Sequence, residues 1–462
     1  MKGSFSFQDS FRFAMNESRN ISKNQTLCRV LAGSGVADVV SLLQGDIFVV
    51  CDRAVLPLAE EIVKEGRTQA VIRTVLALET SEEKKNLDTV MDICRWLLEN
   101  GADRSSMLLA IGGGITSDMA GFAASIYKRG IRFAFIPTTL LAQVDAAIGG
   151  KTGVNFLDLK NMLGVIRQPE WTWICPEPLR TLPLRDFRGG AAELLKTFLI
   201  ENRNDSYARA VRLLTSLCGQ ATCPASVFPD SATNRTETDA CPGTDAAMGG
   251  DGQNAGGPGS TRTACMDSET ERKLQALIAG AAAVKADIVG RDPYERGERR
   301  KLNLGHTFAH GIESEARKQG YDISHGEAVA IGILLAARLA EALGLTESSL
   351  TEPAGAADEN PGRTEVEAAF GEKGLAARLE ADFAACGLPT ASPFPLEALA
   401  GAMTKDKKAE GGAVRFILPI TVGTVVERTL TVPEALDLLG KGPARDDTAA
   451  DLRDTGATDK EI

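Results

Sequence analysis

The first third of the chain alternates between short apolar runs and stretches whose apolar residues have helical spacing. Residues 46–52 (DIFVVCD) and 70–78 are apolar runs of strand length, and residues 56–65 between them have the spacing of an amphipathic helix. Residues 81–100 continue as a second amphipathic helix, which Gly101 would end. This alternation predicts βαβ units and therefore a parallel sheet.

A glycine-rich turn follows the next predicted strand. Residues 107–114 (MLLAIGGG) lead from an apolar strand into three glycines, and residues 115–125 continue as a helix. Such a turn lets backbone amides approach a phosphate at a helix N-terminus. The spacing is not GxGxxG, however, so a tight strand–helix turn explains the glycines equally well. Asp52 ends its strand at a position where an acid often binds a nucleotide ribose.

The second half of the chain has mainly helical patterns. Residues 188–200, 269–290 and about 327–343 have apolar residues at helical spacing, and about 414–425 has the pattern of a strand pair. We therefore predict an α/β nucleotide-binding domain with a parallel sheet over residues 1–182, followed by a mainly α-helical domain over residues 183–442.

Three segments lack such patterns. Residues 218–267 contain no Leu or Ile and are rich in Gly, Pro, Ser, Thr and Ala, which predicts a disordered insertion. The four cysteines in this segment lack the spacing of a zinc site. A second Gly/Pro/acid loop is predicted at 351–363, and a disordered acidic tail at 443–462.

Composition narrows the possible functions. The 462-residue chain has a net charge of −11, which argues against general nucleic-acid binding and against an anionic membrane surface. The chain starts without an apolar leader, and its longest apolar run is too short to cross a bilayer. We therefore expect a cytoplasmic protein with reduced cysteines.

All three histidines of the chain lie between residues 301 and 327. His306 and His310 would share one face of a helix, and His325 opens the long apolar helix. Core or capping histidines would explain one of these residues, but the cluster favours a metal or proton-transfer centre. Together with Glu193, His306 and His325 would form a catalytic zinc set. Thr307 replaces the glutamate that a zincin protease requires after its first histidine.

Cations are concentrated in the middle of this acidic chain. Arg129, Lys151 and Lys160 follow one another within a glycine-rich region, as expected for an anion site. Lys196 shares a helix face with Glu193. Asp145 is the one acid in the apolar run 140–148 and needs a partner.

Several characteristic motifs follow one another along the chain, namely LKNMLG, RTLPLRDFRGGAAELLK, VKADIV, LNLGHTFAHGIE, HGEAVAIG, DKK and the long motif GGGITSDMAGFAASIYKRGIRFAFIPTTLLAQVDAAIGGKTGVN. In these motifs the chain resembles the 3-dehydroquinate synthases of the sugar phosphate cyclase superfamily. These motifs cover most of residues 46–425. The resemblance implies an NAD-binding α/β domain and a helical metal-binding domain, and it implies a homodimer.

The resemblance also implies a set of site residues. One divalent metal ion, Zn²⁺ with Co²⁺ as an alternative, would be held by Glu193, His306 and His325. NAD⁺ would be bound by Asp52, Glu82, Lys85, Gly113, Gly114, Asp118, Thr138, Thr139, Thr181 and Leu182. Asp145, Lys151 and Lys160 would belong to both the NAD⁺ site and the substrate pocket. A one-residue slip from Lys85 to Lys84 is an alternative alignment. Catalysis and substrate binding would involve Arg129, Lys151, Asn161, Lys196, Lys285, Arg299, Asn303, His310 and Lys407, of which Arg129 would reach into the partner subunit's site.

The implied reaction converts 3-deoxy-D-arabino-heptulosonate 7-phosphate to 3-dehydroquinate and phosphate, in the shikimate pathway. It combines transient oxidation by NAD⁺, phosphate elimination, reduction and aldol ring closure. Alternatives are a sister cyclase acting on another sugar phosphate, a metal-dependent polyol dehydrogenase of the same fold, and a non-catalytic paralogue. Arg299, Asn303 and His310 together favour the dehydroquinate reaction over the sister cyclases.

Overall fold

The computed structural model describes residues 28–33, 35, 37–66, 71–157, 159–218, 266–346, 374–404 and 413–441. The predicted loop 351–363, the predicted tail 443–462 and Lys407 lie outside the described residues, as does nearly all of the predicted insertion 218–267.

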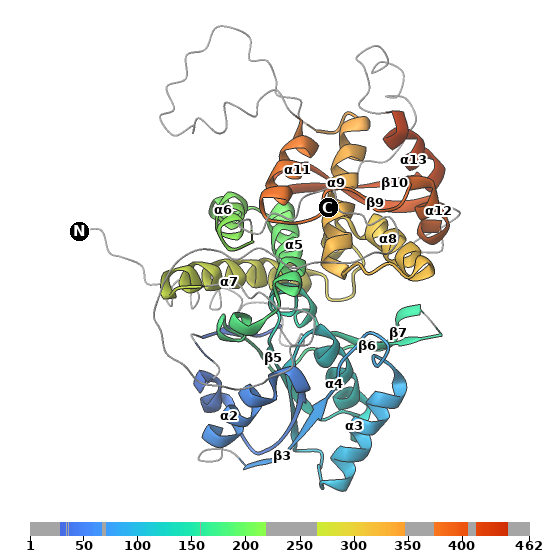
Figure 1. Cartoon of the computed structure of the whole chain (residues 1–462). Helices are drawn as coiled ribbons and strands as arrows, with labels where there is room; N and C mark the ends of the chain where they lie inside the picture. Colours follow the sequence, from blue (N-terminus) through green and yellow to red (C-terminus); the bar gives the residue numbers. More distant parts are fainter. Residues whose placement is uncertain are drawn as a thin grey trace, which may run out of the picture.

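Six parallel strands form the sheet of the N-terminal half (Figure 1). Their order across the sheet is β1 (Val30–Ala32), β8 (Thr172–Ile174), β5 (Arg132–Pro137), β4 (Met107–Gly112), β2 (Asp46–Asp52) and β3 (Val71–Leu78). Every pairing in this sheet is parallel. The predicted parallel sheet is therefore confirmed.

Helices cover both faces of the sheet, and the side chains of a strand alternate between the two cores that result. Phe48 and Val50 of β2 pack in the core shared with α3 (Leu87–Glu99) and α4 (Gly114–Ile126). Ile47, Val49 and Cys51 of the same strand pack in the core shared with α2 (Leu56–Gly66).

One predicted helix begins later than its pattern indicated. Helix α3 starts at Leu87, not at residue 81, because the Asn86 side chain accepts a hydrogen bond from the Thr89 amide at 3.0 Å and caps the helix. Residues 82–84 form a turn instead. This difference places Glu82 and Lys85 in a connection at the carboxyl edge of the sheet.

An antiparallel hairpin, which the sequence pattern did not predict, follows the sheet's β5 strand. It consists of β6 (Lys151–Phe156) and β7 (Leu159–Ile166). Its apolar tip is exposed, with Leu157 78% and Leu159 55% accessible to solvent.

The C-terminal half is mainly helical and shares one large hydrophobic core. Its helices are α5 (Leu184–Ile200), α6 (Ser206–Cys218), α7 (Ser268–Arg291), α8 (His306–Gln319), α9 (His325–Ala342), α11 (Leu375–Ala385), α12 (Leu396–Thr404) and α13 (Val432–Lys441). The strands β9 (Ala413–Thr421) and β10 (Thr424–Thr431) form an antiparallel pair. Figure 1 shows α7 lying crosswise between the sheet and the other helices. The domain boundary near residue 182 stays a prediction.

Short helical elements connect these pieces. They are η2 (Ala37–Leu42), η3 (Arg53–Val55), η4 (Tyr127–Arg129), the π-helix η5 (Ala142–Ala146), η6 (Glu177–Thr181), η7 (Arg203–Asp205) and η8 (Glu298–Asn303). Among the described residues, no helix is both long and apolar enough to cross a membrane.

Two glycine contacts bring α5, α8 and α9 together. A Cβ atom on Gly326 would lie 2.1 Å from the Gly189 carbonyl oxygen of α5, and one on Gly332 would lie 2.2 Å from the Gly305 carbonyl oxygen. Only glycine allows the backbone of α9 to approach α5 and the start of α8 this closely. The first residues of α8 and α9 are thereby held against the middle of α5.

Candidate metal centre and active site

Glu193, His306 and His325 come from three helices and meet at one point. Glu193 lies in the middle of α5, whereas His306 and His325 are the first residues of α8 and α9. The Glu193 Oε1 atom lies 3.7 Å from His306 Nε2 and 3.4 Å from His325 Nε2. The potential ligand atoms of the three residues all lie within 4.8 Å of one another, as a shared metal ion requires. The structure thus brings together the three residues predicted as ligands.

The other ring nitrogen of each histidine has a hydrogen-bond partner. His306 Nδ1 lies 3.1 Å from the Leu304 carbonyl oxygen, and His325 Nδ1 lies 3.3 Å from Glu313 Oε1. When Nδ1 carries the proton and donates to these acceptors, the lone pair of each Nε2 is directed to the side where Glu193 lies. Glu313 was not predicted. Its position seven residues after His306, on the same face of α8, is the signal that could have found it.

Glu193 is completely buried, and neither of its carboxylate oxygens has a hydrogen-bond partner among the described residues. Lys196 Nζ lies 2.5 Å from Glu193 Oε2, outside hydrogen-bond geometry. Burial would raise the pKa of Glu193, but the charge of Lys196 outweighs this and lowers that pKa to about 2. A buried, ionised carboxylate whose Oε1 faces two histidines and has no hydrogen-bond partner fits a metal ligand.

The two histidines differ in charge preference. Burial and the nearby Lys196 hold the pKa of His306 well below its usual value, so its imidazole is neutral, as a metal ligand must be. Burial would also lower the pKa of His325, but the carboxylates of Glu193 and Glu313 outweigh it and raise that pKa to about 10. The negative charges that favour a proton on His325 also favour a metal cation beside it. The three residues therefore fit a divalent metal ion.

One further lysine, Lys285, is buried near Glu193, and the partly buried Asp145 contacts both Lys285 and Lys196. Lys285 Nζ forms an ion pair with Asp145 Oδ1 and donates to the Asp145 carbonyl oxygen at 2.7 Å, and Lys196 Nζ lies 3.8 Å from Asp145 Oδ1. Burial would raise the pKa of Asp145, but Lys196 and Lys285 lower it. Burial lowers the pKa of Lys285, which Asp145 only partly offsets. Asp145 thus has the partners that its apolar surroundings required.

The predicted substrate residues of η8 lie beside this cluster. Arg299 is 2% exposed, and its Nη2 donates to the Gly149 carbonyl oxygen at 2.9 Å. Lys151 Nζ forms an ion pair with Glu295, whose Oε1 accepts a hydrogen bond from Asn303 Nδ2 at 2.5 Å. Glu295 therefore links two predicted substrate residues, and it was not predicted from the sequence.

The predicted dinucleotide residues gather at the carboxyl edge of the sheet. Asp52 caps η3 by accepting a hydrogen bond from the Ala54 amide at 2.9 Å. The Thr138 amide donates to the Gly112 carbonyl oxygen at 2.9 Å, which joins the ends of β4 and β5. A Cβ atom on Gly113 would lie 3.2 Å from the Thr139 methyl carbon. Gly113 caps α4, and Gly114 is its first residue, so the glycine turn opens at this edge.

Lys85 connects the dinucleotide edge to the hairpin. Its Nζ lies 2.5 Å from Asp118 Oδ2 and donates to Asn161 Oδ1 at 2.5 Å. Lys85 is 6% exposed, whereas Lys84 is exposed and forms an ion pair with Glu79 at 2.8 Å. This placement favours Lys85 over Lys84 in the alignment.

The hairpin also contacts α8. Lys160 Nζ donates to Glu313 Oε1 at 3.0 Å and lies 4.0 Å from Glu82 Oε1. Glu82 in turn accepts a hydrogen bond from Asn155 Nδ2 at 2.8 Å. Predicted NAD and substrate residues are thus joined through β6 and β7.

Other predicted residues lie elsewhere around the site. The His310 ring centroid lies 5.8 Å from that of His306, one turn further along α8. Thr181 ends η6, and Leu182 packs in the hydrophobic core of the helical half rather than with the glycine turn. Arg129 follows α4 and precedes β5, so it lies at the amino edge of the sheet, opposite the glycine turn.

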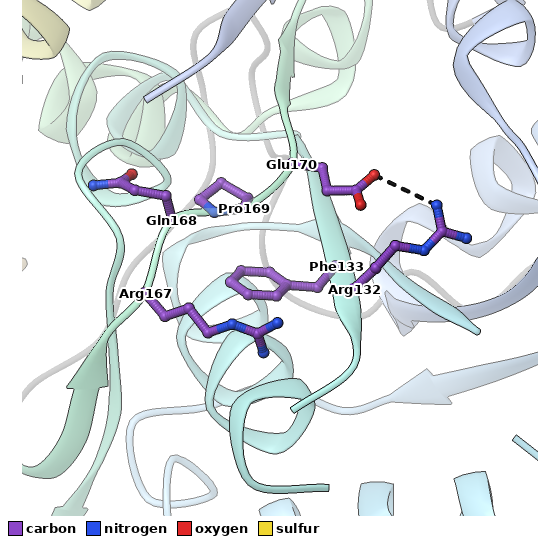
Figure 2. Close-up of a pocket in the computed structure, with 6 residues that line it drawn as sticks. All are labelled: Arg132, Phe133, Arg167, Gln168, Pro169 and Glu170. Atoms are coloured by element: carbon purple, nitrogen blue, oxygen red, sulfur yellow. Dashed lines mark ion pairs between the residues drawn. The ribbon is translucent and has the colours of Figure 1, made fainter. Parts of the chain in front are cut away.

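A separate pocket of about 240 Å³ opens at that amino edge (Figure 2). It is lined by Arg132, Phe133, Arg167, Gln168, Pro169 and Glu170. The Arg167 guanidinium lies 5.2 Å from the centre of the Phe133 ring, and Arg132 pairs with Glu170 at 3.7 Å. None of the predicted site residues lines this pocket.

Solved structures with this fold include sugar phosphate cyclases. The structure of 2-epi-5-epi-valiolone synthase from Streptomyces hygroscopicus, with NAD⁺ and Zn²⁺ bound, has a TM-score of 0.65 and 23% identity and covers 92% of this chain and 99% of that chain. The structure of 2-deoxy-scyllo-inosose synthase with carbaglucose-6-phosphate, NAD⁺ and Co²⁺ has a TM-score of 0.63 and 19% identity and covers 90% of this chain and 99% of that chain. The chain therefore shares its fold with these two enzymes.

Sequence comparisons identify the family. The 3-dehydroquinate synthase N-terminal and C-terminal family models match residues 75–189 and 260–357. The chain is 34% identical over 399 residues to the 3-dehydroquinate synthase of Acidithiobacillus ferrooxidans, which covers 86% of this chain and 88% of that protein. The chain belongs to the 3-dehydroquinate synthase family, as its motifs predicted.

Proposed function

We propose that the chain converts 3-deoxy-D-arabino-heptulosonate 7-phosphate to 3-dehydroquinate and phosphate, with NAD⁺ and one divalent metal ion bound. The main support is that Glu193, His306 and His325 form a cluster next to five cationic side chains. This cluster lies at the carboxyl edge of a parallel sheet of the kind that binds dinucleotides. The enzyme would be a carbon–oxygen lyase, because phosphate leaves by elimination.

The two bound groups would supply the chemistry that side chains lack. Bound NAD⁺ accepts and returns a hydride, and the metal ion polarises the substrate hydroxyls. Support comes from two structures of the same fold, which contain NAD⁺ with Zn²⁺ or Co²⁺. Glu193, His306 and His325 would hold the metal. The glycine turn at Gly113 and Gly114 would receive the dinucleotide phosphates.

The chain's own residues would bind and orient the substrate. Lys151, Lys160 and Asn161 lie on the hairpin and would neutralise the phosphate group. Arg299 would bind the substrate carboxylate with its guanidinium. Lys196, buried between Asp145 and Glu193, and His310 would transfer protons. Asp145 would keep Lys196 and Lys285 charged and fixed in position.

An assay of two products tests this function. Purified protein is incubated with the heptulosonate phosphate, NAD⁺ and Zn²⁺, and phosphate, dehydroquinate and NADH are measured. We expect stoichiometric phosphate and dehydroquinate without net NADH, because the hydride is returned in each turnover. NADH accumulating on simple polyols without phosphate release would contradict the proposal and indicate a dehydrogenase.

Glu193→Gln tests the metal assignment within the same assay. The substituted glutamine side chain lacks the charge that a divalent ion requires, so we expect both bound metal and phosphate release to be lost. Glu380→Gln is the matched control, because Glu380 pairs with Arg338 on the surface. Full metal content in Glu193→Gln would place the ion elsewhere.

A further inference from the structure

The Glu313 carboxylate connects the candidate metal centre to the hairpin. It is 6% exposed, and its Oε1 atom lies 3.3 Å from His325 Nδ1 and 3.0 Å from Lys160 Nζ. The three residues come from α8, α9 and β7. One buried oxygen atom therefore contacts both a candidate metal ligand and a candidate phosphate-binding lysine.

The contact continues toward the dinucleotide edge. Asn161, next to Lys160, has a positive φ of 52° and accepts a hydrogen bond from Lys85 Nζ at 2.5 Å. Lys85 in turn pairs with Asp118 of α4 at 2.5 Å. Adjacent residues of β7 contact two different partners, Lys160 contacting Glu313 and Asn161 contacting Lys85. The hairpin thus links the metal centre to the predicted NAD site.

We propose that Glu313 is a positioning residue that fixes the His325 imidazole for the metal ion and holds Lys160 over the substrate site. This inference rests on the proposed metal site. A carboxylate that accepts the Nδ1 proton of a ligand histidine sets its tautomer and ring orientation and makes its Nε2 a better ligand. The same carboxylate keeps the Lys160 ammonium close to the metal centre, where the phosphate of the substrate would approach.

The test measures metal binding without turnover. Metal-free Glu313→Gln is titrated with Co²⁺ in competition with a chelator, and the visible spectrum of the bound Co²⁺ is recorded. Loss of an outer partner of a ligand histidine typically weakens metal affinity by about 10- to 100-fold. We expect this loss together with a shift of the Co²⁺ absorption bands. Glu315→Gln is the matched control, because Glu315 lies on the same helix but pairs with Lys318.

Lys160→Met separates the two roles of Glu313. This variant keeps the contact between Glu313 and His325, so its Co²⁺ spectrum and affinity should stay near those of the wild type. Its KM for the sugar phosphate should rise about tenfold or more, as expected for a lost charged hydrogen bond to phosphate. Glu313→Gln should show both defects, whereas a merely structural residue would change neither the spectrum nor the KM in this pattern.

Each outcome has a defined meaning. Wild-type Co²⁺ affinity and spectrum in Glu313→Gln would overturn the inference while leaving the metal site intact. Absence of Co²⁺ binding in the wild type would instead overturn the metal site, and the proposed function with it. If Glu313→Gln does not fold, Glu313→Asp replaces it, because its carboxylate is retained on a stem one methylene shorter. The Glu313→Asp substitution should weaken Co²⁺ binding measurably, although by less than about 100-fold. Unchanged binding would contradict the proposal.

Discussion

At the scale of single residues, the site depends on carboxylates and lysines whose opposite charges lie close together away from water. Glu193 and Asp145 are ionised, and Lys196 lies between them at 2.5 and 3.8 Å. Burial would lower the pKa of Lys196, but Asp145 and Glu193 outweigh this and raise it. Such a set is stable only when its charges are matched, because an unpaired buried charge has lost its hydration without compensation.

We expect Lys196→Met to destabilise the fold strongly. It leaves Glu193 without its cation, and breaking a buried pair of this kind typically costs about 3–5 kcal/mol. The free energy of unfolding in urea measures this effect, in protein prepared without added metal. Lys318→Met is the control, because its ion pair with Glu315 is on the surface and should change little. Equal stability of the two variants would mean that Glu193 is protonated or hydrated.

The residues that sequence reasoning found and missed differ in a physical way. His306 and His325 are two of only three histidines in the chain, and Glu193 shares a helix face with Lys196 in an apolar segment, so the sequence itself indicated a site. Glu313 and Glu295 are ordinary glutamates among many, and only contacts with residues distant in sequence distinguish them. The sequence predicted Lys85 but left Lys84 as an alternative, and burial separates the two in the structure.

At the scale of elements, the fold depends on backbone contacts between helices. Gly326 and Gly189 let α9 touch α5, which places His325 next to Glu193. A side chain at Gly326 would collide with the Gly189 carbonyl oxygen and separate the two helices, which would increase the distance between the candidate ligands.

Gly326→Ala should destabilise the protein and weaken its metal binding. The added Cβ would lie 2.1 Å from the Gly189 carbonyl oxygen, and such overpacking typically costs about 1–3 kcal/mol. Gly401→Ala is the matched control, because a Cβ on this helical glycine of α12 would meet nothing within 4 Å. The control should be stabilised by up to about 1 kcal/mol. Urea unfolding and Co²⁺ titration check both variants, and a fully stable Gly326→Ala would refute the close contact.

The sequence predicted an element correctly where the burial of its residues determines the pattern of apolar and polar positions. The strand at 46–52 is buried on both faces, so it reads as one apolar run and was found with its observed bounds. The β6–β7 hairpin was missed, because β7 exposes most of its residues and has no regular alternation. The start of α3 was misplaced because the Asn86 cap lies inside a segment of helix-forming residues.

At the scale of the whole molecule, Arg129 is separated from the site of its own chain. Helix α4 begins at the glycine turn and has 13 residues, which span roughly 20 Å, and Arg129 follows its far end. The positive φ of 68° at Arg129 and the exposed hairpin tip belong to the same N-terminal half. We propose that the protein is a homodimer in which Arg129 serves the substrate site of the partner.

Mixing two inactive variants tests this proposal. Arg129→Met should lack the arginine in both sites of its dimer, and Glu193→Gln should lack the metal ligand in both. In a mixed dimer, the Arg129→Met chain keeps its metal residues and receives an intact arginine from the Glu193→Gln chain, so one site becomes complete. If equal amounts exchange subunits at random, phosphate release should recover to about a quarter of the wild-type rate, since half of the dimers are mixed and each has one working site. Light scattering establishes the dimer beforehand, and the same mixture assayed before subunit exchange is the control. A mixture that stays inactive after confirmed exchange would mean that Arg129 acts within its own chain or not at all.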